Sequence, residues 1–308
     1  MRQPIDIPSR PGSHAELTRL FEQQSAKRWP LARSTAGERR ERLRRLKSAV
    51  ERHRVALAEG IRRDFGRAVA ESEWIEIHPT LDEINAAIAH LAEWMRPEPA
   101  GTPVLLADTS SEIRFEAKGQ VLILSPWNYP VFLFIGPLVG AVAAGNTAIL
   151  KPSEKVPETN KVLRQIVAEA FPEDEAAVVE GEANVAEALL TLPFNHVFFT
   201  GSTRVGKLVM AAAAKTLASV TWSWVGSPRP TSRPVPTSPA PAGPSSGASS
   251  STPGRPASLR TTSWCRRSSA TPWSSRCGPA WWRATARKRA GRRTPTSPGW
   301  WTPGPLAG

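Results

Sequence analysis

The chain has no acidic residue after Thr221, and this absence divides it into two parts of different composition. Its last 87 residues (222–308) contain 12 Arg and one Lys but no Asp, Glu, His, Ile, Phe, Asn, Gln, Met or Tyr. The formal net charge of +13 therefore belongs to this tail, and the first 221 residues are neutral. Because the basic excess is confined to one segment, it is not a property of the fold.

Cysteine is missing from the first 221 residues, since Cys265 and Cys277 both lie in the tail. This absence excludes a disulfide framework in that part of the chain. No apolar signal core opens the sequence, and the longest apolar stretch, 131–144, is too short and too interrupted by glycine to span a bilayer. We therefore expect a cytoplasmic protein with no membrane partner. The five histidines show no metal-ligand spacing, so we expect no metal site.

Helical patterns dominate the first hundred residues. Thr35 and Glu38 form a capping-box pattern that opens a long amphipathic helix with apolar positions up to Ile61. Five arginines on this helix are interleaved with glutamates: Arg39, Arg40, Arg44, Arg45 and Arg52. This pattern favours a solvated face, on which the arginines pair with glutamates of the same helix, and not a phosphate-binding face. A second helical stretch, 68–95, should break or bend near Pro79.

Short apolar runs follow, with a β-hairpin predicted from 104–107 and 112–116. Beyond it, predicted strands at 119–124, 147–150, 176–179 and 196–199 alternate with predicted helices at 131–144, 158–170, 185–190 and 204–214. Such alternation predicts an α/β fold with a doubly wound parallel sheet, whose ligands bind at the carboxyl ends of the strands.

The first candidate site lies in the loop after the 119–124 strand. Pro126 and Pro130 fix the backbone there, so Trp127 and Asn128 are held rigidly at the carboxyl end of the strand. The Asn128 amide can then donate to an oxyanion that develops on a carbonyl substrate. Capping of the following turn is the alternative role, and the spacing leaves both open.

Two further groups of candidate residues follow strands. Lys151 and Glu154 place a cation and a carboxylate where they can hold ribose hydroxyls, although a surface ion pair explains the same spacing. Gly201 and Ser202 lead into a helix whose amino terminus offers backbone donors to a pyrophosphate. Ser202 adds a hydroxyl, and Gly206 permits close contact between helix and strand. Because the pattern is not GxGxxG, an ordinary strand-to-helix turn remains the alternative.

The motifs PWNYP, AAGNTAILKPSE and FTGSTRVG, in this order and at these separations, resemble the aldehyde dehydrogenase superfamily. The stretch GPLVGAVAAGN is most similar to the class 3 and coniferyl aldehyde dehydrogenases. This resemblance covers roughly 17–221. It implies an N-terminal helical region at 1–100, an oligomerisation-type β-hairpin at 101–118 and an incomplete, Rossmann-like NAD(P)-binding domain at 119–221.

The resemblance also implies a reaction and roles for residues. Family members oxidise an aldehyde to a carboxylic acid with NAD or NADP, and the intact member is expected to be a homodimer. By this resemblance Asn128 stabilises the oxyanion, and the cofactor is held by Trp127, Lys151, Glu154, Gly201, Ser202 and Gly206. NAD and NADP both stay open, because Glu154 repels a 2′-phosphate whereas Lys151 and Lys155 attract one.

Two catalytic residues of the family are missing from the chain as written. Family members use a cysteine nucleophile and a glutamate that activates water. The glutamate belongs to the motif LELGGKSP, which should follow Thr221, where the chain reads WSWVGSPRP. Codons for 222–228, read one nucleotide earlier, permit LELGGKS. The same offset permits IVWGKFLN at 245–252 and TCIAPDYV at 256–263, which resemble the family's passage through its nucleophile.

We therefore interpret 222–308 as an out-of-frame translation, disordered and without the catalytic cysteine, so that the chain is expected to be inactive. A single-nucleotide insertion or deletion near the Thr221 codon must then restore LELGGKSP. The alternative is a dinucleotide-binding module whose disordered basic tail binds nucleic acid through phosphate contacts and tryptophan stacking. We do not expect nucleic acid as a partner, and filter binding that vanishes on removal of 222–308 would contradict us.

Overall fold

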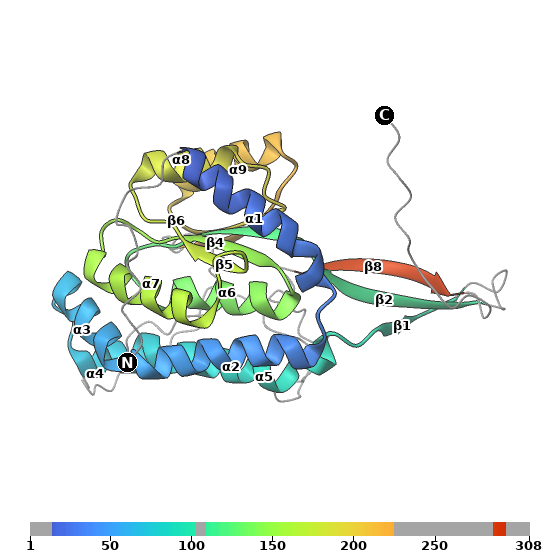
Figure 1. The fold of residues 1–308 in the computed structure, drawn as a ribbon, viewed down its shortest axis with the longest axis horizontal. Helices are drawn as coiled ribbons and strands as arrows, with labels where there is room; N and C mark the ends of the chain where they lie inside the picture. Colours follow the sequence, from blue (N-terminus) through green and yellow to red (C-terminus); the bar gives the residue numbers. More distant parts are fainter. Residues whose placement is uncertain (1–13, 103–108, 225–285, 294–308) are drawn as a thin grey trace, which may run out of the picture. The chain divides into compact units, whose positions relative to one another are not determined.

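A computed structural model describes residues 14–102, 109–224 and 286–293 of the chain (Figure 1). These residues belong to one of two units of the chain, and the other, Gly226–Trp273, lies outside the described residues. The helical region expected at the start of the chain consists of α1 (His14–Ala32), α2 (Ala36–Arg52), α3 (Arg54–Phe65), α4 (Val69–Ser72), the π-helix η1 (Glu73–Ile77) and α5 (His78–Trp94).

The predicted doubly wound parallel sheet is confirmed. Its strands, in the order β5-β4-β3-β6-β7, are β3 (Gln120–Leu124), β4 (Thr147–Lys151), β5 (Ala176–Val178), β6 (His196–Gly201) and β7 (Ser219–Trp224), and all neighbours are parallel. The connecting helices are α6 (Phe132–Ala144), α7 (Pro157–Ala170), α8 (Ala183–Thr191) and α9 (Thr203–Lys215). Every strand and helix predicted between 119 and 214 is present, with bounds that differ by at most two residues.

The sheet has an apolar cluster on each face, as the alternation of side chains along a strand requires. Val121 and Ile123 of β3 belong to the cluster that includes α2, α3, α5, α6 and α7. Leu122 and Leu124 of the same strand belong to the cluster that includes α1, α8 and α9. Figure 1 shows these two sets of helices on opposite faces of the sheet. The chain therefore forms a three-layer sandwich at this position.

The helix α6 lies in the middle of the larger cluster and is apolar on all sides, as a fully buried helix must be. It ends at Gly145, whose φ of 81° lies in the left-handed region that favours glycine. A Cβ at this position would lie 2.8 Å from the carbonyl oxygen of Leu31 and 2.7 Å from the guanidinium of Arg39. Only glycine fits this turn. Gly145 therefore allows the chain to leave α6 and enter β4.

The first helices differ from prediction in two places. Thr35 forms the predicted capping box, because its Oγ1 accepts from the Glu38 N–H at 3.3 Å and its N–H donates to the Glu38 carboxylate at 2.7 Å. The single long helix predicted after it is wrong, since the chain turns at His53 and α3 begins there. Near Pro79 the chain stays helical but is not one regular α-helix, because the π-helix η1 ends at Ile77 and the proline occupies the first turn of α5, where helices need no backbone N–H.

The solvated arginine face predicted for α2 is wrong at Arg39, which is 4% exposed. Its guanidinium donates to Ser34 Oγ at 3.0 Å and to the carbonyl oxygens of Ala143 at 3.0 Å and Ala32 at 2.9 Å. Arg39 thus binds the carboxyl ends of α1 and α6, where helical carbonyls lack partners. By contrast, Arg44 pairs with Glu41 on the exposed surface, as the sequence predicts.

A second, antiparallel sheet has the strand order β1-β2-β8. It contains β1 (Glu98–Ala100), β2 (Ser110–Ala117) and β8 (Ala286–Arg293). The predicted strand 112–116 falls within β2, which pairs with β1. Its predicted partner, 104–107, lies outside the described residues, so the hairpin as predicted stays a prediction.

The predicted disorder of 222–308 is wrong for two stretches, and the remainder lies outside the described residues. Trp222 lies in β7, where it pairs with Phe199 of β6. The strand β8 pairs with β2 over its whole length. Residues 280–294 contain no proline, so this part of the tail keeps the backbone donors that a sheet ladder requires.

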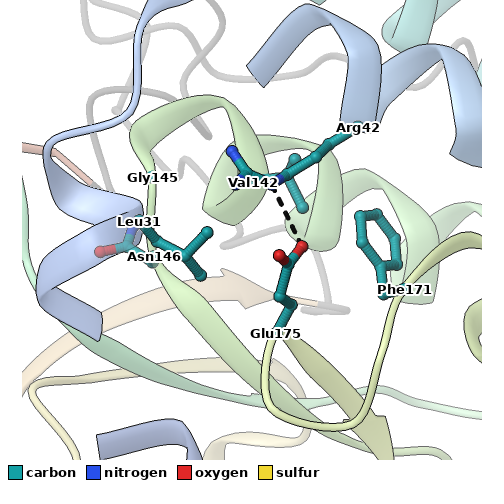
Figure 2. Close-up of a pocket in the computed structure, with 7 residues that line it drawn as sticks. All are labelled: Leu31, Arg42, Val142, Gly145, Asn146, Phe171 and Glu175. Carbon is teal, nitrogen blue, oxygen red and sulfur yellow. Dashed lines mark hydrogen bonds and ion pairs between the residues drawn. The ribbon is translucent and has the colours of Figure 1, made fainter. Parts of the chain in front are cut away.

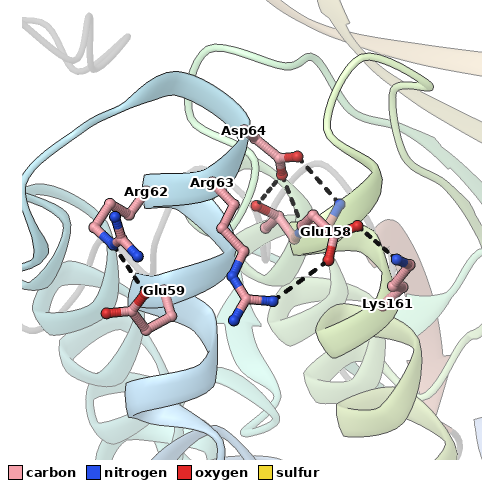
Figure 3. Close-up of polar contacts among 7 residues, drawn as sticks. Glu59, Arg62, Arg63, Asp64, Glu158 and Lys161 are labelled. Atoms are coloured by element: carbon pink, nitrogen blue, oxygen red, sulfur yellow. Dashed lines mark hydrogen bonds and ion pairs between the residues drawn. The ribbon is translucent and has the colours of Figure 1, made fainter.

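A carboxylate from α3 caps the amino terminus of α7 (Figure 3). Asp64 accepts from the N–H groups of Glu158 at 3.1 Å and Thr159 at 2.8 Å, and from the Thr159 hydroxyl at 2.7 Å. Replacing Asp64 by alanine should lower the free energy of unfolding by about 1 to 2 kcal/mol, the usual cost of losing a helix cap. Denaturant unfolding measures it, and Asp82→Ala, at an exposed position of α5, is the control. Equal midpoints for the two variants would contradict the capping role.

Candidate functional site

The strand order places the switch point of the sheet, where open α/β folds bind ligands in a crevice, at the carboxyl ends of β3 and β6. From β3 the chain passes to β4 and β5 on one side, and it then returns to add β6 and β7 on the other. Connections therefore leave these two neighbouring strands in opposite directions, which is the position where open α/β sheets bind ligands. The loop that carries Trp127 and Asn128 follows β3, Lys151 ends β4, and Gly201 ends β6. The fold thus brings all three predicted groups to one edge of the sheet.

Three buried polar atoms at this edge have no hydrogen-bond partner among the described residues: Ser125 Oγ, Asn128 Oδ1 and Thr200 Oγ1. Leu124 and Phe199 are the last residues at which β3 and β6 pair with each other, and Ser125 and Thr200 are each one residue beyond them. Unpaired buried polar atoms are costly, and a cluster of them is typical of a site that binds a polar ligand. The Asn128 side-chain oxygen accepts no hydrogen bond from a following turn in the described part of the chain, so the capping role is not observed there.

The Lys151 side chain is only 7% exposed, and its Nζ lies 3.3 Å from Glu154 Oε2. Burial disfavours the ionised Glu154, but hydrogen bonds from its own backbone and from Lys151 lower its pKa below the usual value. Glu154 is therefore a carboxylate at neutral pH. The predicted ion pair is present, and the 45% exposure of the Glu154 side chain leaves this carboxylate accessible.

Trp127 is half exposed and is held by contacts with two residues. Its ring lies 6.1 Å from the ring of Phe65 and 5.7 Å from the Lys155 ammonium. The sequence indicates only the charge of Lys155. No local sequence pattern predicts its cation–π contact with Trp127. These contacts keep the indole beside the end of β4.

The turn after β6 leaves backbone donors open. Ser202 caps α9, since its Oγ accepts from the Val205 N–H at 3.5 Å. The N–H groups of Thr203 and Arg204 have no partner among the described residues, and both residues are exposed. An open helix amino terminus of this kind attracts anions.

Gly206 makes the close helix-to-strand contact that its position predicts. A Cβ on Gly206 would lie 2.6 Å from the Trp222 ring and 3.5 Å from the Phe199 ring. The two aromatic rings meet edge to face, with centroids 5.9 Å apart. Any larger residue at 206 would therefore push α9 away from β6 and β7.

Sequence patterns missed two residues that support the Asn128 loop. Glu76 of η1 is fully buried and accepts from the Val131 N–H at 2.8 Å. Arg67 donates to the Asn128 carbonyl oxygen at 3.0 Å. A signal for Glu76 was present in the helical spacing. Ser72 and Thr80, four residues away on either side, are buried as well, so the Glu76 charge falls on the inward face of the helix.

A small pocket lies elsewhere, at the amino ends of the strands (Figure 2). Gly145 and Asn146, which precede β4, line it together with Arg42 and Glu175, whose side chains form an ion pair at 3.1 Å. Its volume of about 10 Å³ is that of one water molecule. It cannot admit a substrate or a cofactor.

The described residues contain no group of three or more His, Cys, Asp or Glu side chains arranged to hold a metal ion. Within the same ranges, no helix is both long and apolar enough to cross a membrane. The crevice at β3 and β6 is thus the candidate site, and its chemistry comes from an amide, hydroxyls, an ion pair and backbone donors.

Comparisons with known proteins agree with this arrangement. Residues 12–227 match the model of the aldehyde dehydrogenase family. The putative aldehyde dehydrogenase AldX of Bacillus subtilis is 43% identical over 206 residues, which are 67% of this chain and 46% of that protein. A probable coniferyl aldehyde dehydrogenase of Pseudomonas aeruginosa is 41% identical over 207 residues, 67% of this chain and 44% of the relative.

The solved structure of AldH from Staphylococcus aureus in a substrate-bound state is similar as well. It superimposes with a TM-score of 0.66 at 36% identity, over 68% of this chain and 45% of that chain. The chain thus spans about half the length of the relatives it matches.

Proposed function

Because the chain belongs to the aldehyde dehydrogenase family, we propose that it retains the NAD(P)-binding half of such an enzyme and, as written, does not oxidise aldehydes. The family uses NAD(P) and acts on aldehydes. The parent reaction is therefore the NAD(P)-dependent oxidation of an aldehyde to a carboxylic acid, and the parent enzyme is proposed to be a cytoplasmic homodimer. The match to the family ends at 227, whereas Cys265 and Cys277 lie beyond it.

The residues at the crevice fit a dinucleotide. The open N–H groups of Thr203 and Arg204 would donate to the pyrophosphate after Gly201, beside the hydroxyl of Ser202. Lys151 and Glu154 would hold the adenosine ribose, since their ion pair presents both a donor and an acceptor. Trp127 would border the same subsite. When bound, the nicotinamide supplies a hydride acceptor.

Asn128 is proposed to stabilise the oxyanion that forms when a nucleophile adds to an aldehyde. The donor would be the Asn128 side-chain NH₂; the neighbouring Oδ1 is buried and has no hydrogen-bond partner among the described residues, so no hydrogen bond to that oxygen turns the amide away from a ligand. An amide donor fixed in advance stabilises developing negative charge without having to reorganise during the reaction. Trp127 and Lys155 would shield one side of the loop.

One observation supports the loss of turnover. In the strand β7, Ser223 pairs with Thr200 of β6 at the crevice. The family motif LELGGKSP would place glutamate at this position, directly after a leucine in place of Trp222. A serine hydroxyl is too weak a base to activate water for thioester hydrolysis. An out-of-frame translation from 222 onward explains both this serine and the missing cysteine.

Cofactor binding without turnover is the expected result. Titration of the purified chain with NAD⁺ and, separately, NADP⁺ by calorimetry should show saturable binding, while incubation with an aldehyde should give no increase in NAD(P)H absorbance. Lys151→Met should weaken binding about tenfold, equal to about 1.4 kcal/mol. The matched control Lys161→Met, on the exposed side of α7, should leave binding unchanged.

Aldehyde turnover by a homogeneous preparation would overturn the proposal. Sequencing of the coding DNA around the Thr221 codon tests the cause separately, because a single-nucleotide insertion or deletion there must restore LELGGKSP. A gene with no such site would reject the out-of-frame explanation even if turnover is absent.

A further inference from the structure

A buried carboxylate supports the Asn128 loop from a different part of the chain. Glu76 lies in η1, and its side chain is fully buried. Its Oε2 accepts from the N–H groups of Val131 at 2.8 Å and Phe132 at 3.4 Å. These N–H groups open α6, and Val131 has no capping side chain of its own. Glu76 therefore caps α6 from 55 residues earlier in the sequence.

The second oxygen of Glu76 binds Arg67, which in turn holds Asn128. One guanidinium nitrogen of Arg67 pairs with Glu76 Oε1, and the other donates to the Asn128 carbonyl oxygen at 3.0 Å. The same guanidinium lies 5.2 Å from the ring of Phe65 and 5.5 Å from the ring of Tyr129. Two rings and two hydrogen bonds thus fix its orientation, and its planar fork suits such bridging.

Arg67 and Glu76 together hold the loop at Asn128 and again just after it. Arg67 binds the backbone at Asn128, and Glu76 binds it three residues later at Val131. Burial raises the pKa of Glu76, and the Val131 N–H and Arg67 oppose that shift. A buried ion pair is seldom needed for stability, since apolar packing of equal volume serves as well. The contacts at Asn128 and Val131 therefore bear on the geometry of the loop as well as on the start of α6.

We propose that Glu76 and Arg67 are positioning residues that hold the side-chain amide of Asn128 toward the carbonyl oxygen of the substrate. The inference rests on the proposed oxyanion role of Asn128. The side chain needs this support because its own Oδ1 is buried without a hydrogen-bond partner among the described residues. Without the pair, the Asn128 carbonyl oxygen would lose its Arg67 donor and the Val131 N–H would lose its acceptor, one on each side of Tyr129 and Pro130.

Selective ¹⁵N-asparagine labelling gives a direct measurement on the full chain. The sequence contains six asparagines: Asn85, Asn128, Asn146, Asn160, Asn184 and Asn195. Their side-chain NH₂ groups give six pairs of NMR signals, and Asn128→Ala identifies the pair that belongs to Asn128. We expect a single sharp pair for Asn128 in the unmodified chain. In Glu76→Gln it should broaden beyond detection or split, while the other five pairs stay unchanged.

Glutamine is nearly the same size as glutamate, but its NH₂ group replaces one of the two acceptor oxygens and would face either the Val131 N–H or the Arg67 guanidinium, both of which are donors. Arg67→Met, at a side chain that is 17% exposed, removes the other half of the pair and should give the same change. Glu71→Gln on the exposed surface of α4 is the matched control and should leave all six pairs unchanged. If Glu76→Gln fails to fold, Arg67→Met decides the matter alone.

Unchanged Asn128 signals in both variants would overturn the proposal, and so would equal changes in all six pairs, because these indicate a general loss of structure. The measurement needs neither cofactor nor aldehyde. Failure of the NAD(P) titration therefore leaves its result intact, and the two proposals fail separately.

Discussion

Arg39→Met should lower the free energy of unfolding by about 3 kcal/mol, because it leaves buried carbonyl oxygens without a donor. The guanidinium binds the last turns of two helices, at Ala32 of α1 and Ala143 of α6. Neither helix has a basic residue in its own last turn. Burial, and next the charge of Arg42, lower the Arg39 pKa to about 10, so the cation persists at neutral pH. Urea unfolding followed by circular dichroism measures the change.

The control for this prediction is Arg44→Met on the same helix. The Arg44 side chain is 58% exposed and pairs only with Glu41, so its removal should cost about 0.5 kcal/mol or less. A similarly small change in Arg39→Met would mean that the methionine side chain compensates fully by packing. The buried arginine would then contribute to the arrangement of the helices and not to stability.

Acidification from pH 6.5 to pH 5 should lower the free energy of unfolding by about 1.6 kcal/mol through His196 alone, because the slope rises across this window from half to nearly all of about 1.4 kcal/mol per pH unit. His196 is fully buried at the start of β6. Burial, and next the charge of Lys118, lower its pKa to about 3 from the ordinary 6.5, and a contact with Ser219 opposes the shift. Its ring lies 2.8 Å from Ser219 Oγ and 3.1 Å from Thr221 Oγ1.

The sign follows from which state binds the proton. Between pH 6.5 and about pH 3 the unfolded chain protonates His196 and the folded chain does not. Stability is therefore complete above pH 6.5 and falls as the pH decreases through this window. His196→Gln should remove this part of the slope, whereas His90→Gln, at a side chain that is 45% exposed, should keep it. Equal slopes in both variants would contradict a neutral buried His196.

The sequence predicted the sheet well because its strands and helices carry local signals. The buried runs around Val121 and Ile149 are strongly apolar, and a capping box at Thr35 marks the start of α2. The residues after each strand were also predictable, since parallel strands bring their carboxyl ends to one edge. The sequence alone therefore predicts Asn128, Lys151 and Gly201 as candidate site residues.

Tertiary partners account for what the sequence did not predict. Arg39 and Ala143 are 104 residues apart, and no pattern within α2 indicates that this arginine is buried while Arg44 is exposed. Glu76 likewise finds its partner 55 residues later, at Val131. The composition of the tail predicts disorder at Trp222, because composition carries no information about the contact between the Trp222 ring and Gly206. In each case a distant contact overrides a local preference.

The larger apolar cluster joins α2, α3 and α5 to the same face of the sheet as α6 and α7. The helical region before residue 100 is therefore no independent appendage, since Asp64, Glu76 and Arg39 all reach across to helices that cover the strands. Folding must assemble the two regions together. A nascent polypeptide leaving the ribosome would gain most of its protection from proteases only after α7 had emerged, because Asp64 and much of this cluster would until then lack their partners.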